Sequence, residues 1–141
     1  MADKESSSNT RPIVLIVDDD VDSLSLISIA IQRAGYIVHR ATSGNEALKV
    51  MDSLTPDVIV LDLMMPLMSG MEGMRLLKAK YPWPPPVIMF TAKGQIEDKV
   101  SGMEAGAYRY LVKPTPKDVL LEAIKDAVQE KKGRPRLTGR W

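Results

Sequence analysis

Short apolar runs alternate along the chain with longer segments in which apolar residues recur every three or four positions. The runs are rich in β-branched residues, and we predict five strands, at residues 13–17, 36–40, 58–61, 87–90 and 108–112. Several of these runs are apolar at consecutive positions, as is typical of strands in a parallel sheet that helices cover on both faces.

The segments between the runs carry the signals of helices. The first helix is predicted over residues 22–34 and ends at a glycine, and its inner face is formed by Leu24, Ile27, Ile31 and Ala34. The second and third open at 43–46 and 69–72, where serine followed three residues later by glutamate predicts a capping box.

Two further helices follow the same logic. One is predicted over residues 95–105, with Ile96, Val100 and Met103 facing inward. The last is expected to begin at Thr115-Pro116, with threonine as the cap and proline in the first turn, and to end near residue 133. Its packing residues are predicted to be Leu120, Ala123, Ile124, Ala127 and Val128.

Five alternations of strand and helix with short connections predict a doubly wound α/β fold. The 141 residues suffice for one domain, which we place at 12–132 between a polar leader at 1–11 and a basic tail at 133–141. The Tyr-Pro-Trp-Pro-Pro-Pro segment at 81–86 is interpreted as a rigid connection, the alternative being a polyproline ligand.

Composition excludes several classes of function. With 45% hydrophobic and 26% charged residues the chain is typical of soluble globular proteins, and a net charge of +1 argues against direct nucleic-acid binding. No cysteine is present, which excludes disulfides and thiolate metal sites and fits a reducing compartment. Neither a signal peptide nor a membrane span is evident, so we expect a cytoplasmic protein without a membrane partner.

Polar groups follow the predicted strands at their carboxyl ends, where doubly wound sheets bind ligands. Asp18, Asp19 and Asp20 follow the first strand. The third, fourth and fifth strands are followed by Asp62, Thr91 and Lys113, respectively. These side chains are therefore expected to meet at one edge of the sheet.

The chemistry of this set is that of phosphoryl transfer. Carboxylates gathered at Asp18, Asp19 and Asp62 repel one another unless a cation intervenes, and Mg2+ is the hard, oxygen-seeking ion that suits them. Lys113 and Thr91 are phosphate-binding groups. No histidine or cysteine belongs to the set, so the nucleophile is predicted to be the Asp62 carboxylate, which would form an acyl phosphate.

Four segments in this order resemble the receiver domain of two-component response regulators, over roughly residues 12–131. They are the acidic opening Val-Leu-Ile-Val-Asp-Asp-Asp at 14–20, the segment at 56–70 around Asp62, Val-Ile-Met-Phe-Thr-Ala at 87–92, and Ala-Gly-Ala-Tyr-Arg-Tyr-Leu-Val-Lys-Pro at 105–114. The resemblance implies a flavodoxin-like five-stranded parallel sheet of order 2-1-3-4-5.

The resemblance also implies roles for individual residues. Asp62 would accept a phosphoryl group from a histidine kinase or phosphotransfer protein. Asp19, Asp62 and the Met64 carbonyl would ligate Mg2+, with assistance from Asp18. Lys113 would hold a phosphoryl oxygen. The protein would then be a phosphoacceptor that assists its own phosphorylation and dephosphorylation, and not an enzyme in the usual sense.

The switch implied by the resemblance involves Thr91, which would turn toward the phosphoryl group, and Tyr110, which would pack inward. The Lys113-Pro114 bond is expected to be cis. A downstream protein partner would bind the surface of the fourth helix, fifth strand and fifth helix, and phosphorylation could be accompanied by homodimerisation.

Two other classes stay open at this point. Asp18 and Asp20 form the Asp-x-Asp of haloacid dehalogenase-type phosphate hydrolases, although a cap domain and a late acidic pair are missing. A docking module that works without phosphorylation is the other alternative. A calcium loop is rejected, because Ser23 and Ile29 stand where glycine and glutamate are needed.

Overall fold

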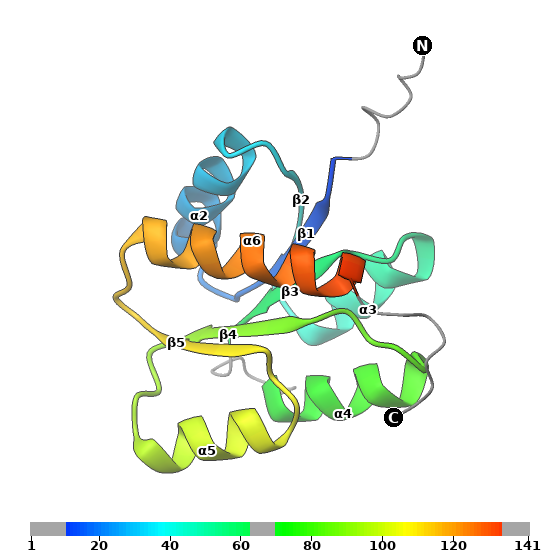
Figure 1. The fold of residues 1–141 in the computed structure, drawn as a ribbon, viewed down its shortest axis with the longest axis vertical. Helices are drawn as coiled ribbons and strands as arrows, with labels where there is room; N and C mark the ends of the chain where they lie inside the picture. The colour runs from blue at the N-terminus through cyan, green and yellow to red at the C-terminus, as the bar shows by residue number, and fades with distance from the viewer. Residues whose placement is uncertain (1–10, 63–69, 134–141) are drawn as a thin grey trace.

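The computed structural model describes residues 11–62 and 70–133 (Figure 1). The strands are β1 (Ile13–Val17), β2 (Ile37–Ala41), β3 (Val58–Leu61), β4 (Val87–Thr91) and β5 (Arg109–Val112). The helices are α2 (Val21–Arg33), α3 (Gly44–Ser53), α4 (Gly70–Lys80), α5 (Ile96–Glu104) and α6 (Lys117–Gly133). Most of the predicted leader, the tail beyond residue 133 and the proposed cap Ser69 lie outside the described residues.

All strand pairs are parallel, and the sheet order is β2-β1-β3-β4-β5, which confirms the predicted fold. Helices α2 and α6 cover one face, and α3, α4 and α5 cover the other (Figure 1). Alternate residues of each strand enter different cores: Leu15 and Val17 of β1 face α3 and α4, whereas Val14 and Ile16 face α2 and α6.

Helix α2 begins at a side-chain cap and ends at a glycine. Asp20 is the N-cap and accepts hydrogen bonds from the backbone amides of Asp22 and Ser23. Gly35 follows the helix with a φ of 105°, which a residue with a side chain rarely adopts. The prediction that Ala34 packs inward is wrong: it is the exposed C-cap, because the chain turns there toward β2.

Helix α3 has a variant of the predicted capping box. The Ser43 hydroxyl accepts a hydrogen bond from the Glu46 amide at 3.1 Å, as expected. The Glu46 carboxylate, however, accepts from the backbone amide and the hydroxyl of Thr42, and not from the Ser43 amide. The return bond therefore ties the helix to the end of β2.

Helix α5 contradicts the predicted inner face. Ile96, Val100 and Met103 are 76%, 49% and 47% exposed, and the buried residue of the helix is Gly102. The reason is that the ring of Tyr110 on the neighbouring strand β5 fills the space under the helix. The apolar stripe of α5 therefore faces solvent.

The last helix packs as predicted, with its five predicted core residues all buried. It begins at Lys117, so Pro116 precedes the first turn, and the Thr115 hydroxyl donates to the Val112 carbonyl instead of capping the helix. Among the described residues, no helix is both long and apolar enough to cross a bilayer.

The proline-rich segment connects α4 to β4. Pro85 and Pro86 are buried, and the Pro86 carbonyl accepts a hydrogen bond from the Ile59 amide at 3.0 Å. A polyproline ligand needs an accessible surface, so the interpretation as a rigid connection is the one that the structure supports.

Candidate functional site

Sheet register brings the strand-end acids together. Val17 of β1 pairs with Leu61 of β3, and the next residues are Asp18 and Asp62. The Asp62 amide continues the ladder by donating to the Val17 carbonyl at 3.0 Å. The two carboxylates consequently leave the same edge of the sheet from adjacent parallel strands.

Three carboxylates form a compact cluster at this edge. Oxygen atoms of Asp18, Asp19 and Asp62 all lie within 4.8 Å of one another. Asp18 and Asp62 are 5% and 8% exposed, whereas Asp19 faces solvent. Asp20 caps α2 instead, although its amide donates to Asp18 Oδ1 at 2.9 Å and so orients that carboxylate. We call Asp18, Asp19 and Asp62 the acid cluster.

Lys113 brings a positive charge to the acid cluster. Its Nζ lies 2.7 Å from Asp18 Oδ2 and 3.6 Å from Asp62 Oδ2. Burial alone would lower the pKa of Lys113, but the hydrogen bond to Asp18 and the negative charges of Asp18 and Asp62 outweigh burial, so the pKa is raised. Lys113 is therefore a cation throughout the physiological pH range.

The ammonium of Lys113 also lies 5.1 Å from the ring centroid of Phe90, a cation–π distance. A role for Phe90 was not predicted from the sequence, although the alternation of strand residues contains the signal for it. Phe90 and Leu111 belong to the same core, and Lys113 is two residues beyond Leu111, on the same side of the sheet. The expected cis bond between Lys113 and Pro114 is present.

Thr91 and Tyr110 form a second group, linked through Lys93. The fully buried Thr91 accepts a hydrogen bond from the Lys93 amide at 3.3 Å, and the Tyr110 hydroxyl donates to the Lys93 carbonyl at 2.7 Å. Burial, followed by the charges of Asp98 and Asp62, raises the pKa of Tyr110. Within the described residues, the Thr91 side chain makes no hydrogen bond to the acid cluster or to Lys113.

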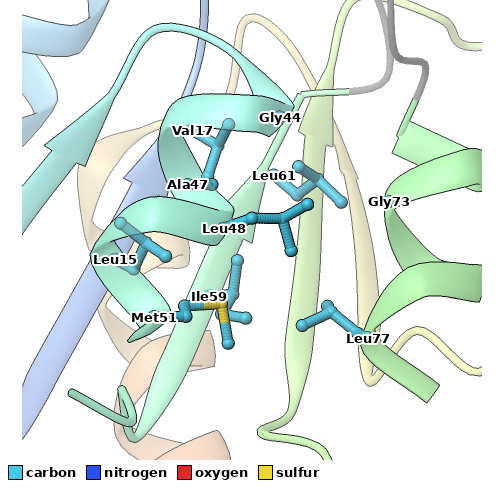
Figure 2. A pocket seen from close by; sticks show the side chains of 10 residues that line it. All are labelled: Leu15, Val17, Gly44, Ala47, Leu48, Met51, Ile59, Leu61, Gly73 and Leu77. Atoms are coloured by element: carbon cyan, nitrogen blue, oxygen red, sulfur yellow. The ribbon is translucent and has the colours of Figure 1, made fainter. Parts of the chain in front are cut away.

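Two pockets lie elsewhere in the molecule, away from the acid cluster. One is an apolar cavity of about 30 Å3 between α3, α4 and the sheet, lined by Leu48, Leu61 and Gly73 among others (Figure 2). The other, of about 310 Å3, lies at the amino ends of β4 and β5, with Lys78 and Glu130 in its lining. Neither includes a member of the acid cluster.

The donor set of the acid cluster suits a hard divalent cation. All of its ligand atoms are carboxylate oxygens, and the exposed Asp19 leaves the cluster open to solvent. Mg2+ is bound in this manner, by one or two carboxylates with water completing its shell. Met64, whose carbonyl was expected to contribute, lies outside the described residues.

The sequence profile described as the response regulator receiver domain matches residues 14–125. The DNA-binding dual master transcriptional regulator RpaA of Synechocystis sp. is 39% identical over 115 residues, which are 81% of this chain and 48% of RpaA. The alkaline phosphatase synthesis transcriptional regulatory protein PhoP of Bacillus subtilis is 40% identical over 107 residues, 75% of this chain and 44% of PhoP. The chain thus spans less than half the length of these relatives.

Solved structures of response regulators are also similar to this chain. The chemotaxis response regulator CheY4 of Vibrio cholerae is 34% identical with a TM-score of 0.76, and the match covers 84% of this chain and 99% of CheY4. The BeF3-activated DrrB receiver domain is 32% identical with a TM-score of 0.77, covering 85% and 99% of the two chains.

The profile match extends over most of the chain, and strand order, acid cluster and relatives all indicate the same class of protein. Such domains are phosphoacceptor switches and not classical enzymes, which excludes the hydrolase alternative. They work in two-component signalling with histidine kinases or phosphotransfer proteins. The chain belongs to the response regulator receiver domain family.

Proposed function

We propose that this chain is a phosphorylation-controlled switch in which Asp62 accepts a phosphoryl group from a phosphohistidine of a kinase or phosphotransfer protein, with Mg2+ as cofactor. The observation that carries the proposal is the convergence of the acid cluster and Lys113 at one edge of the sheet. Three acids and a lysine from three separate segments of the chain meet there, which neither capping nor core packing requires.

Asp18, Asp19 and Asp62 would hold the Mg2+, together with the Met64 carbonyl. When bound, Mg2+ supplies positive charge that offsets the negative charge of the phosphoryl oxygens. The partly exposed position of the cluster gives both the ion and the donor access, because Asp19 lies at the surface.

The transfer itself needs a nucleophile and a cation. An oxygen of the Asp62 carboxylate attacks phosphorus, the phosphorus–nitrogen bond of the donor breaks, and the donor imidazole leaves with the electron pair and takes up a proton. Lys113, whose Nζ is 3.6 Å from Asp62 Oδ2, supplies positive charge for a phosphoryl oxygen. Hydrolysis reverses the state when water attacks phosphorus and the Asp62 carboxylate is released.

Phosphorylation would act on the rest of the molecule through Thr91 and Tyr110. A phosphoryl oxygen offers a hydrogen-bond acceptor to the Thr91 hydroxyl, and Thr91 is joined to Tyr110 through Lys93. The surface formed by α5, β5 and α6 is the proposed docking face for a downstream protein partner and for homodimerisation. Apolar side chains are exposed on α5, at Ile96, Val100 and Met103. Exposed apolar patches of this kind are typical of protein–protein interaction sites.

Intact-mass spectrometry after incubation with acetyl phosphate and Mg2+ tests the proposal. The unmodified sequence is expected to gain one phosphoryl group, whereas Asp62→Asn gains none and a chelator blocks labelling. Asp52→Asn is the matched control, because Asp52 is an exposed acid on α3 that pairs with Lys80 away from the site. Labelling of Asp62→Asn at the unmodified level would refute the proposal, as would absence of labelling by acetyl phosphate and phosphoramidate alike.

A further inference from the structure

Gly102 is the buried residue of α5, and the space beside it is too small for a side chain. A Cβ atom at this position would lie 2.7 Å from Cδ2 and 2.9 Å from Cε2 of Tyr110, and 3.3 Å from Sδ of Met89. Real Cβ atoms essentially never make contacts below 3.0 Å, so a neighbouring atom would have to shift. Since glycine inside a helix costs about 1 kcal/mol relative to alanine, helix formation does not favour glycine here.

The Tyr110 ring has little freedom to yield to such an atom. Tyr110 pairs with Met89 in the sheet and packs against the core beneath α5. Its hydroxyl is held by the Lys93 carbonyl at 2.7 Å. The sulfur of Met89 can move, but a planar ring fixed at its backbone and at its hydroxyl can only swing out of the core.

A continuous set of contacts therefore joins α5 to the end of β4. Gly102 adjoins the Tyr110 ring, Tyr110 binds the Lys93 carbonyl, and the Lys93 amide binds the Thr91 hydroxyl. Strand β5, which carries Tyr110, lies beside α5 (Figure 1), and with its ring beneath α5 the Tyr110 hydroxyl reaches the Lys93 carbonyl.

We propose that Gly102 is the positioning residue of the switch: its missing side chain creates the seat that Tyr110 occupies when the domain holds a phosphoryl group. This inference rests on the proposed function. A methyl group at position 102 would raise the free energy of the inward Tyr110, and by linkage it would weaken binding of any ligand that favours that state.

The test uses Mg2+ with beryllofluoride, a phosphoryl mimic, titrated by NMR of the backbone amides at Thr91 and Lys93. Gly102→Ala is expected to bind beryllofluoride at least about fivefold more weakly than the unmodified protein, the lower end of measured couplings between sites. Gly73→Ala is the matched control, a helical glycine on α4 whose added Cβ would, among the described residues, meet Leu61 alone, at 3.8 Å. Its affinity is expected to stay within about twofold, since it makes no contact in the set.

A double variant separates this role from a general loss of packing. In the Tyr110→Ala background, Gly102→Ala is expected to change the affinity less than about twofold, because the ring that it would displace is gone. Equal weakening in both backgrounds, or unchanged affinity of Gly102→Ala alone, would overturn the inference. If Gly102→Ala does not fold, recovery of folding in the double variant supports the steric conflict, and failure of both contradicts it.

The two proposals fail in different ways. If the unmodified protein binds no beryllofluoride, the proposed function and the switch role of Gly102 are both wrong. If the unmodified protein binds beryllofluoride, and Gly102→Ala and Gly73→Ala have the same affinity for it, only the positioning role of Gly102 is wrong.

Discussion

At the scale of single residues, the important feature of the site is the positive charge that Lys113 places beside two buried carboxylates. Asp18 and Asp62 are almost fully buried, and the Lys113 ammonium, at 2.7 Å from Asp18 Oδ2 and 3.6 Å from Asp62 Oδ2, offsets part of their negative charge. The sequence predicted this meeting, because each residue directly follows an apolar strand. It did not predict that Thr91 would bind Lys93 and not the cluster, since that contact depends on the path of the loop after β4.

Replacing Lys113 by methionine is expected to lower the free energy of unfolding by about 3 kcal/mol at neutral pH without Mg2+, because it breaks the ion pair with the buried carboxylate of Asp18. Added Mg2+ should restore part of the loss. Urea unfolding with and without Mg2+ measures both effects. In the control Lys80→Met, which removes an exposed ion pair with Asp52, little change is expected. A Lys113→Met protein as stable as the unmodified one in Mg2+-free buffer would contradict this account.

At the scale of elements, local signals predicted some features correctly and others wrongly: the packed face of α6 was correct, whereas Thr115 does not cap that helix. The Ser43 cap of α3 follows from the spacing of serine and glutamate, whereas the inner face of α5 was predicted wrongly. Apolar periodicity assumes that the longest side chains face the sheet. In α5 a tyrosine from β5 occupies that space, so the helix approaches through Gly102.

The cap of α3 predicts a pH dependence. Hydrogen bonds from the amide and hydroxyl of Thr42 lower the pKa of Glu46, so its contribution to stability is complete above the unfolded-state pKa, about 4.3, and is lost as pH falls through the lower folded-state value. Glu46→Gln should therefore be less stable than the unmodified protein at pH 7, and the difference should shrink below about pH 4. Thermal unfolding across this range measures it, and a constant difference would contradict the assignment.

Helix α4 carries a glycine whose replacement should stabilise the protein. Gly73 borders the apolar cavity beside Leu61 (Figure 2), and an added Cβ would make an ordinary contact at 3.8 Å. Gly73→Ala is therefore expected to raise the free energy of unfolding by about 0.5 to 1 kcal/mol, because alanine has a higher helix propensity than glycine and restricts the unfolded chain more. Urea denaturation tests this, and a loss of stability would show that the cavity cannot accept a methyl group.

At the scale of the whole molecule, the fold followed from the sequence because strand and helix patterns alternate five times. The register could not be obtained from local pattern, yet it places Asp18 beside Asp62, since Val17 pairs with Leu61. Two cores formed by alternate residues of the same strands fix that register, because a slip of one residue would exchange their faces. The site is thus a property of the sheet and not of any one segment.

Mg2+ is expected to stabilise the folded chain as a whole, because an ion that binds only the folded state shifts the unfolding equilibrium. At a free concentration ten times its dissociation constant the gain is about 1.4 kcal/mol. Thermal unfolding over a series of Mg2+ concentrations should show the midpoint rising for the unmodified protein and for Asp52→Asn. An equal rise in Asp19→Asn and Asp62→Asn would place the ion elsewhere.

The most direct measurement traps the phosphorylated carboxylate. Borohydride reduces an acyl phosphate to an alcohol, so treatment after incubation with acetyl phosphate and Mg2+ converts a phosphorylated aspartate to homoserine. Peptide sequencing by mass spectrometry is expected to find homoserine at position 62 alone, and only when Mg2+ is present. Homoserine at another aspartate, or phosphoryl label on a residue that borohydride leaves unchanged, would contradict the account.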